Sequence, residues 1–121
     1  MEAGQAEIIT LPYRVSASLS VEPAPGHTAG HAVLRLESRG ERAYFTGDAF
    51  HHPVQATQPE LCLPGCDDPG QAAETRQALL ARLEGEQAYL FPAHFSAPHY
   101  GRVQRADAGF TFAPGTPGAL A

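Results

Sequence analysis

The sequence has no lysine, and its few positive charges are scattered. All eight basic residues are Arg, against thirteen acidic ones, which gives a net charge of −5. Nucleic-acid-binding surfaces gather basic residues, often with aromatic ones between them, so this composition excludes nucleic acid as a partner. Apolar runs long enough to cross a bilayer are also lacking, and we expect no membrane partner. The opening Met1-Glu2-Ala3-Gly4 lacks a charged-then-apolar signal, so we expect a cytoplasmic protein.

Cysteine is scarce, and its two copies form no strong catalytic or metal motif. Cys62 and Cys66 lie in Cys-Leu-Pro-Gly-Cys. Structural zinc sites take roughly four ligands, and redox pairs favour a shorter spacing, so both functions are poorly supported. A disulfide across the Pro64-Gly65 turn is geometrically conceivable but unusual in a reducing compartment, and we expect two thiols in a loop. No Ser or Cys has the sequence context of a covalent nucleophile.

The remaining composition suits one modest domain. The chain has 121 residues, of which 43% are hydrophobic, enough for a core. Neither an internal repeat nor a low-complexity linker divides it. We expect a single, partial domain over residues 1–113 and a flexible tail over 114–121, where Pro and Gly recur.

Alternating apolar residues predict several strands before the middle of the chain. Residues 15–22 alternate with a period of two and are followed by two prolines, which predicts a strand that ends there. Residues 32–37 and 42–46 predict two more strands, joined as a hairpin through Ser38-Arg39-Gly40-Glu41. Gly47 then allows the backbone to leave the sheet sharply.

A helix and further strands are predicted in the second half. Residues 49–67 carry prolines without periodicity and predict a long loop. Asp67-Asp68-Pro69 is typical of a helix start, and Gly85 of its end, so we expect a helix over about 69–84. Its apolar side comprises Ala72, Ala73, Leu79, Leu80 and Leu83. Short strands are expected over 87–91 and 109–112.

This order of elements predicts an α+β fold, with a four- or five-stranded, mainly antiparallel sheet and one helix on a face. The second face of the sheet then has no cover within the chain. An apolar face of that kind implies a partner chain or a further half of the fold. We expect a homodimer or higher homo-oligomer, with Val15, Leu19, Val33 and Phe45 as candidates for the contact.

Three segments place histidines and a carboxylate at the ends of probable strands. They are Pro25-Gly26-His27-Thr28-Ala29-Gly30-His31, Thr46-Gly47-Asp48 and Pro92-Ala93-His94-Phe95. Loops that follow strands hold metal ligands rigidly while leaving them accessible. Two imidazoles and one carboxylate suit Fe²⁺, Mn²⁺ or Zn²⁺. We therefore expect His27, Asp48 and His94 to converge on a divalent ion.

These segments resemble the third, fourth and fifth metal motifs of metallo-β-lactamase-fold hydrolases. Further matches over 51–55, 67–69 and 109–110 resemble the methyl parathion hydrolase and lactonase-like branch. The resemblance runs from about Pro23 to Phe112. It implies half of an αβ/βα sandwich, because the His-x-His-x-Asp-His segment that supplies the family's other ligands occurs nowhere in the sequence.

The resemblance also implies residue roles. His27 is similar to the histidine that completes the first metal's ligands, Asp48 to the carboxylate that bridges both metals, and His94 to the histidine on the second metal. Asp48 is thereby the candidate catalytic residue. His31 is expected to be structural and to bond a neighbouring backbone carbonyl. His51 and His52 are either loop residues or substitutes for the absent ligands.

The implied activity is hydrolysis of a small ester, lactone or phosphotriester by a metal-bound hydroxide. One or two divalent ions would serve as cofactors, Zn²⁺ or otherwise Mn²⁺, Fe²⁺ or Co²⁺. The site would be completed by oligomerisation, by His51 or His52, or by solvent. Two alternatives stay open at this point: a catalytically inactive metal-binding fragment, and a dimeric interaction module.

Overall fold

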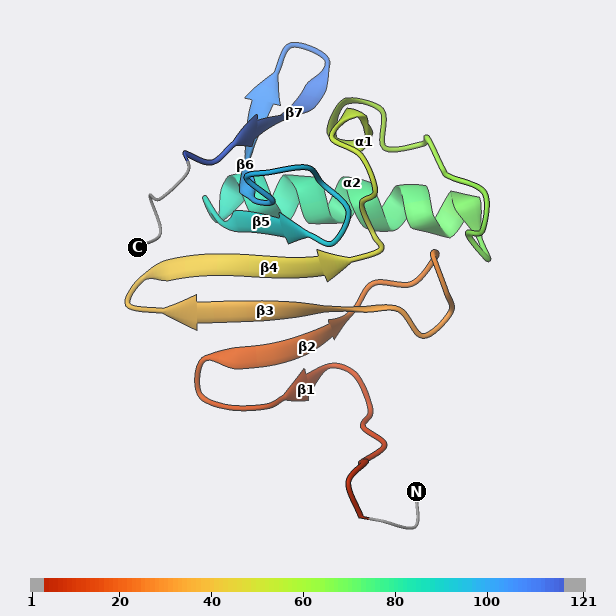
Figure 1. Ribbon diagram of the computed structural model, residues 1–121, viewed down its shortest axis with the longest axis vertical. Helices are drawn as coiled ribbons and strands as arrows, with labels where there is room; N and C mark the ends of the chain where they lie inside the picture. Colours follow the sequence, from red (N-terminus) through yellow and green to blue (C-terminus); the bar gives the residue numbers. More distant parts are fainter. Residues whose placement is uncertain (1–3, 117–121) are drawn as a thin grey trace.

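Seven strands follow one another across a single sheet in the order of the sequence. The computed structural model describes residues 4–116 (Figure 1). All neighbouring strands are antiparallel except β4 and β5, which run parallel and are joined through both helices. The elements are β1 (Tyr13–Arg14), β2 (Leu19–Pro23), β3 (Ala32–Ser38), β4 (Glu41–Gly47), α1 (Val54–Thr57), α2 (Pro69–Gly85), β5 (Tyr89–Pro92), β6 (Gly101–Ala106) and β7 (Gly109–Pro114).

The α+β class, the mainly antiparallel sheet and the single long helix are confirmed, but the sheet has seven strands and not the four or five expected. The hairpin of β3 and β4 matches its predicted range to within a residue at each end. In α2, the Asp68 carboxylate accepts a hydrogen bond from the Gln71 amide at 2.9 Å, as expected of an N-cap. The helix runs through Gly85, and Glu86 is its C-cap. Among residues 4–116, no helix is both long and apolar enough to cross a membrane.

The strand predicted over 15–22 is confirmed only from Leu19, where β2 begins, and is wrong for residues 15–18. The chain folds back between β1 and β2, where the amides of Val15 and Ser16 both donate to the Leu19 carbonyl. The Ser16 hydroxyl accepts hydrogen bonds from the amides of Ser18 and Leu19. A serine side chain that bonds nearby amides competes with strand pairing, so the strand is interrupted here although the residues alternate.

The predicted loop over 49–67 contains the short helix α1, and β6 was not predicted. Only Gly101 and Val103 are buried in β6, while Arg102, Gln104 and Arg105 are polar, so the segment carries little strand pattern. The predicted tail over 114–121 lies mostly outside the described residues. Its first three residues are fixed: Pro114 ends β7, the Gly115 amide donates to the Tyr100 carbonyl, and the Tyr100 hydroxyl donates to the Thr116 carbonyl.

The hydrophobic core lies between the sheet and α2, which Figure 1 shows crossing one face of the sheet. Leu80 and Leu83 of the helix are fully buried against it. Val33 also belongs to this core, at 1% exposure, and is therefore not available as a dimer contact. The buried side of α2 includes one residue that the predicted apolar side omits. Arg76 is 1% exposed, and its Nε donates to the Pro59 carbonyl at 2.6 Å.

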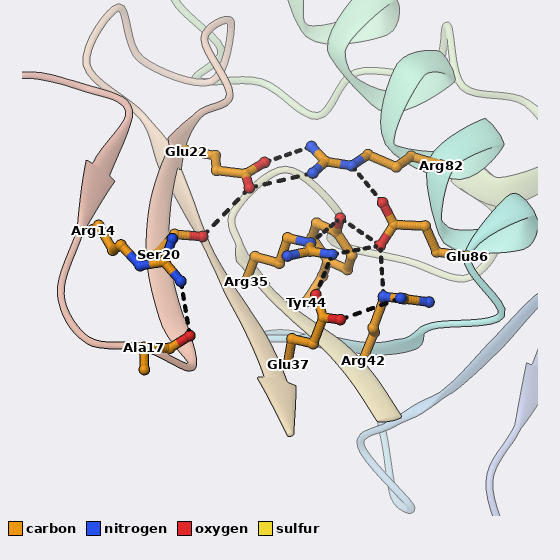
Figure 2. Close-up of polar contacts among 10 residues, drawn as sticks. All are labelled: Arg14, Ala17, Ser20, Glu22, Arg35, Glu37, Arg42, Tyr44, Arg82 and Glu86. Atoms are coloured by element: carbon orange, nitrogen blue, oxygen red, sulfur yellow. Dashed lines mark hydrogen bonds and ion pairs between the residues drawn. The ribbon is translucent and has the colours of Figure 1, made fainter. Parts of the chain in front are cut away.

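A charged network joins α2 to the sheet at the edge of this core (Figure 2). Arg82 lies between Glu22 of β2 and Glu86, and pairs with both. The Glu86 carboxylate accepts hydrogen bonds from the Tyr44 hydroxyl at 3.1 Å and from Arg35 at 3.3 Å. Burial is the main cause that raises the pKa of Tyr44 to about 12, so its hydroxyl stays protonated as a donor.

The opposite face of the sheet is apolar across five strands. Strand register aligns its side chains in two rows, because residues paired directly across strands point to the same face. Leu34 and Phe45 in the first row are 39% and 40% exposed. The first row is Tyr13, Val21, Leu34, Phe45 and Phe91, and the second is Leu19, Leu36, Ala43 and Tyr89. Within residues 4–116, no helix covers these two rows, which we call the apolar sheet face.

Candidate metal centre

His27, Asp48 and His94 meet at one edge of the sheet. Asp48 directly follows β4, His94 follows β5 by two residues, and His27 lies in the loop between β2 and β3. His94 Nε2 lies 2.7 Å from Asp48 Oδ1, and His27 Nε2 lies 3.5 Å from Asp48 Oδ2. The carboxylate therefore stands between the two imidazoles and offers one oxygen to each.

The parallel pairing of β4 and β5 explains why residues far apart in sequence converge here. Adjacent parallel strands end at the same edge of a sheet, so the segments that follow them start side by side. The Gly47 carbonyl accepts a hydrogen bond from the Ala93 amide, which ties the two ends together. Gly47 has a φ of 49°, in the left-handed region that glycine enters without strain.

His31 holds Asp48 from behind, in the structural role expected from the sequence. Its Nδ1 lies 3.0 Å from the Ala24 carbonyl, as predicted. Its Nε2 accepts a hydrogen bond from the Asp48 amide at 3.2 Å. Both nitrogens are thus used when Nδ1 carries the proton. His31 consequently fixes the backbone from which the carboxylate projects.

His51 joins the cluster and His52 does not. One ligand atom each from Asp48, His51 and His94 lie within 4.8 Å of one another. The His51 ring stacks on that of His94, with centroids 4.8 Å apart and planes at 11°. His52 is exposed, and its Nδ1 accepts a hydrogen bond from the Val54 amide. The two neighbouring histidines therefore differ in role, a difference that the sequence left open.

The electrostatics of the cluster favour a metal-binding protonation state. Hydrogen bonding from His94, aided by the charges of the neighbouring histidines, lowers the pKa of Asp48, so the carboxylate is ionised at neutral pH. Burial is the main cause that lowers the pKa of His51. An ionised carboxylate beside imidazole nitrogens is a donor set that Zn²⁺ and other first-row ions accept. The residues present therefore fit a divalent metal.

Cys62 and Cys66 form a disulfide, and the expectation of two free thiols is wrong. The turn through Pro64 and Gly65 brings their Cα atoms to 6.8 Å, within range of a bridge. The bridged segment packs beside the metal cluster, because the Asp67 amide donates to the His27 carbonyl at 3.0 Å. Cys66 Sγ lies 3.9 Å from His27 Nδ1. The disulfide thus lies next to the loop that carries His27.

Comparison with known proteins agrees with this geometry. Residues 15–94 match the family described as the metallo-beta-lactamase superfamily. The hydrolase AbOPH of the beta-lactamase superfamily is 29% identical, with a TM-score of 0.77 over 84% of this chain and 35% of its own. The comparison with curated proteins gives no match.

Two enzymes that hydrolyse lactones share the fold at lower identity. AidC, a dizinc quorum-quenching lactonase, is 24% identical, with a TM-score of 0.83 over 91% of this chain and 38% of its own. An N-acyl homoserine lactone hydrolase is 23% identical, with a TM-score of 0.62 over 78% of this chain and 40% of its own.

The chain spans only 35% and 38% of the first two matched structures, so it corresponds to part of their fold. This partial match agrees with the predicted half of a sandwich. The family match covers well over half of the residues and includes His27, Asp48 and His94. The chain belongs to the metallo-beta-lactamase superfamily.

Proposed function

We propose that this protein is a metal-dependent hydrolase that acts on a small ester, lactone or phosphotriester. The observation that carries the proposal is the convergence of His27, Asp48 and His94 on one edge of the sheet. The substrate class is supported by the similarity to AbOPH, a hydrolase, and to AidC, a lactonase.

His27, Asp48 and His94 are the residues that would hold a divalent ion such as Zn²⁺, Mn²⁺, Fe²⁺ or Co²⁺. When bound, such an ion supplies Lewis-acid chemistry: it lowers the pKa of water and polarises a carbonyl or phosphoryl oxygen. Asp48 contributes the negative charge that attracts the cation. His31 keeps Asp48 in place by accepting a hydrogen bond from its backbone amide. The name of AidC, a dizinc lactonase, supports zinc.

Access to the cluster also supports a reaction with an external substrate. The side chains of Asp48 and His94 are 42% and 50% exposed. A small molecule can therefore approach them without a rearrangement of the core. Both cysteines are paired with each other, so neither is a free thiol for covalent catalysis.

We further propose that a second copy of the chain covers the apolar sheet face. Five strands about 4.8 Å apart give a face roughly 20–25 Å wide, broader than the isolated apolar patches of monomers. Two such faces can pack as aligned sheets about 10 Å apart, with α2 of each copy on the outside. The residues of the two rows are uncharged, and Arg102, which lies over the Tyr89 ring at the end of the second row, is paired with Glu41 at 3.5 Å.

A second candidate function is a metal-binding chain without activity. It is favoured by the coverage of the matched structures, 35% and 38%, together with the absence of a His-x-His-x-Asp-His segment from the sequence. A chain of this kind would bind an ion through the same residues but lack groups needed to position substrate.

Metal content and hydrolysis, measured together, separate these candidates. Zinc-loaded protein should hydrolyse p-nitrophenyl esters, an acyl lactone or a paraoxon-like triester, lose activity with a chelator, and regain it with Zn²⁺, Mn²⁺ or Co²⁺. His94→Ala should abolish the activity, whereas His52→Ala, at an exposed position outside the cluster, serves as the matched control. Turnover that resists the chelator contradicts the metal mechanism, and bound metal without turnover supports the inactive alternative.

A further inference from the structure

His51 is the member of the cluster whose ring has no hydrogen bond to account for its position. Its Nδ1 is buried and has no hydrogen-bond partner among residues 4–116. Buried polar atoms are almost always paired, because an unpaired one costs about 1–3 kcal/mol. The His51 ring offers a ligand atom within 4.8 Å of one from Asp48 and one from His94, so an ion between the three would account for the position of the ring.

The backbone of His51 is held firmly even though its ring is unpaired. Gln55 is 2% exposed, and its Oε1 accepts hydrogen bonds from the amides of His51 at 2.7 Å and His52 at 3.1 Å. Gln55 Nε2 donates in turn to the Leu61 carbonyl at 2.8 Å. This buried amide fixes the start of α1 and orients His51 toward Asp48 and His94, and it leaves His52 in solvent.

Asp48 divides its two oxygens between different neighbours. Oδ2 approaches His27, whereas Oδ1 approaches His94, on which the His51 ring stacks. His27 is absent from the set of atoms that lie within 4.8 Å of one another, while His51 is present. The His51 ring lies near both imidazoles, with its centroid 4.8 Å from that of His94 and 5.2 Å from that of His27, but only His51, His94 and Asp48 offer ligand atoms within 4.8 Å of one another.

We infer that His51 is a third protein ligand to the ion held by Asp48 and His94. This inference rests on the proposed metal-dependent function and adds His51 to its ligands, with His27 at the other oxygen of the Asp48 carboxylate. Two histidines, a carboxylate and an open position form the donor set of a catalytic zinc or non-haem iron site. The ligand comes from the segment between β4 and α1, three residues after Asp48.

Zinc titration of the metal-free full chain tests the assignment. Unsubstituted protein should bind one Zn²⁺ tightly at this site, and His51→Ala should weaken that binding by about 100-fold, since even partners outside the ligand shell contribute about 10–100-fold. His52→Ala is the matched control and should bind as the unsubstituted protein does. Far-UV circular dichroism checks that each variant is folded, and His51→Gln offers a variant of closer volume.

A second measurement avoids substitution altogether. Binding of ¹¹³Cd²⁺, a probe for the zinc site, to ¹⁵N-labelled protein should produce a one-bond coupling to a ring nitrogen of His51. Unchanged zinc affinity in His51→Ala, or cadmium coupling to other histidines but not to His51, overturns the inference. If His51→Ala binds zinc normally but Asp48→Ala does not bind it, the proposed metal function stands without the role of His51. If Asp48→Ala also binds zinc as the unsubstituted protein does, the metal function and the role of His51 are both overturned.

Discussion

Replacement of Gln55 by leucine should destabilise the fold far more than its location in a short helix suggests. The substitution keeps approximate volume but removes two acceptor contacts and one donor contact, all to backbone groups. Each buried backbone group left unpaired costs about 1–3 kcal/mol. Because His52 and Leu61 are exposed, water can serve those two groups in part, whereas the His51 amide is less accessible. We expect a loss of about 2–4 kcal/mol in the free energy of unfolding.

Urea denaturation of metal-free protein, followed by far-UV circular dichroism, measures this loss as a shift in midpoint at constant slope. Gln77→Leu, at an exposed position of α2, is the matched control and should change stability little. Gln55→Glu keeps the acceptor for both amides but places a carboxylate oxygen against the Leu61 carbonyl in a buried position, so it should not restore the parent stability. A Gln55→Leu protein within about 0.5 kcal/mol of the parent would refute the idea that this amide organises the segment.

Three further outcomes are expected. Burial raises the pKa of Glu86, but hydrogen bonds from Arg82 and Tyr44, aided by the nearby arginine charges, lower it more. Glu86 therefore stabilises the fold above the ordinary pKa of a glutamate, and this contribution disappears as the pH falls through the lowered pKa. Glu86→Gln should therefore lower the free energy of unfolding by about 1–2 kcal/mol at pH 7. Urea unfolding at a series of pH values should show a smaller loss of stability on the acid side in the variant than in the parent. A variant profile that runs parallel to that of the parent contradicts the network. Phe45→Asp places a charge at the centre of the apolar sheet face and should convert a dimer to monomer by light scattering; a parent protein that is already monomeric refutes the dimer. Cys62→Ser should leave hydrolysis of p-nitrophenyl esters unchanged, and a loss of that activity would show that the disulfide matters for the site.

The sequence predicted those elements whose signals are local. The β3–β4 hairpin has alternating residues around a glycine-containing turn, and α2 has an Asp-Asp-Pro start, so neighbouring residues alone determined both. The convergence of Asp48 and His94 followed from motifs that precede and follow strands. These predictions required no knowledge of contacts between distant segments.

The errors arose where distant contacts or side-chain bonding decide the structure. Ser16 turns the chain inside an alternating pattern, and β6 forms because it pairs with β5 and β7, although its own residues are mostly polar. Nothing in the sequence separates His51 from His52, because the distinction depends on the buried Gln55. Nor could alternation alone assign Val33 to the face beneath α2.

The one parallel strand pair has a consequence for the order of folding. Pairs such as β2–β3, β3–β4 and β6–β7 join residues that are close in sequence, and each can close with a short loop. Docking of β5 on β4 must close a loop of more than forty residues, which carries a larger entropic penalty and is slower. Asp48 and His94 approach each other only after that step. Metal capture should therefore report the docking of β5 on β4 during refolding, and a bound ion should chiefly slow unfolding.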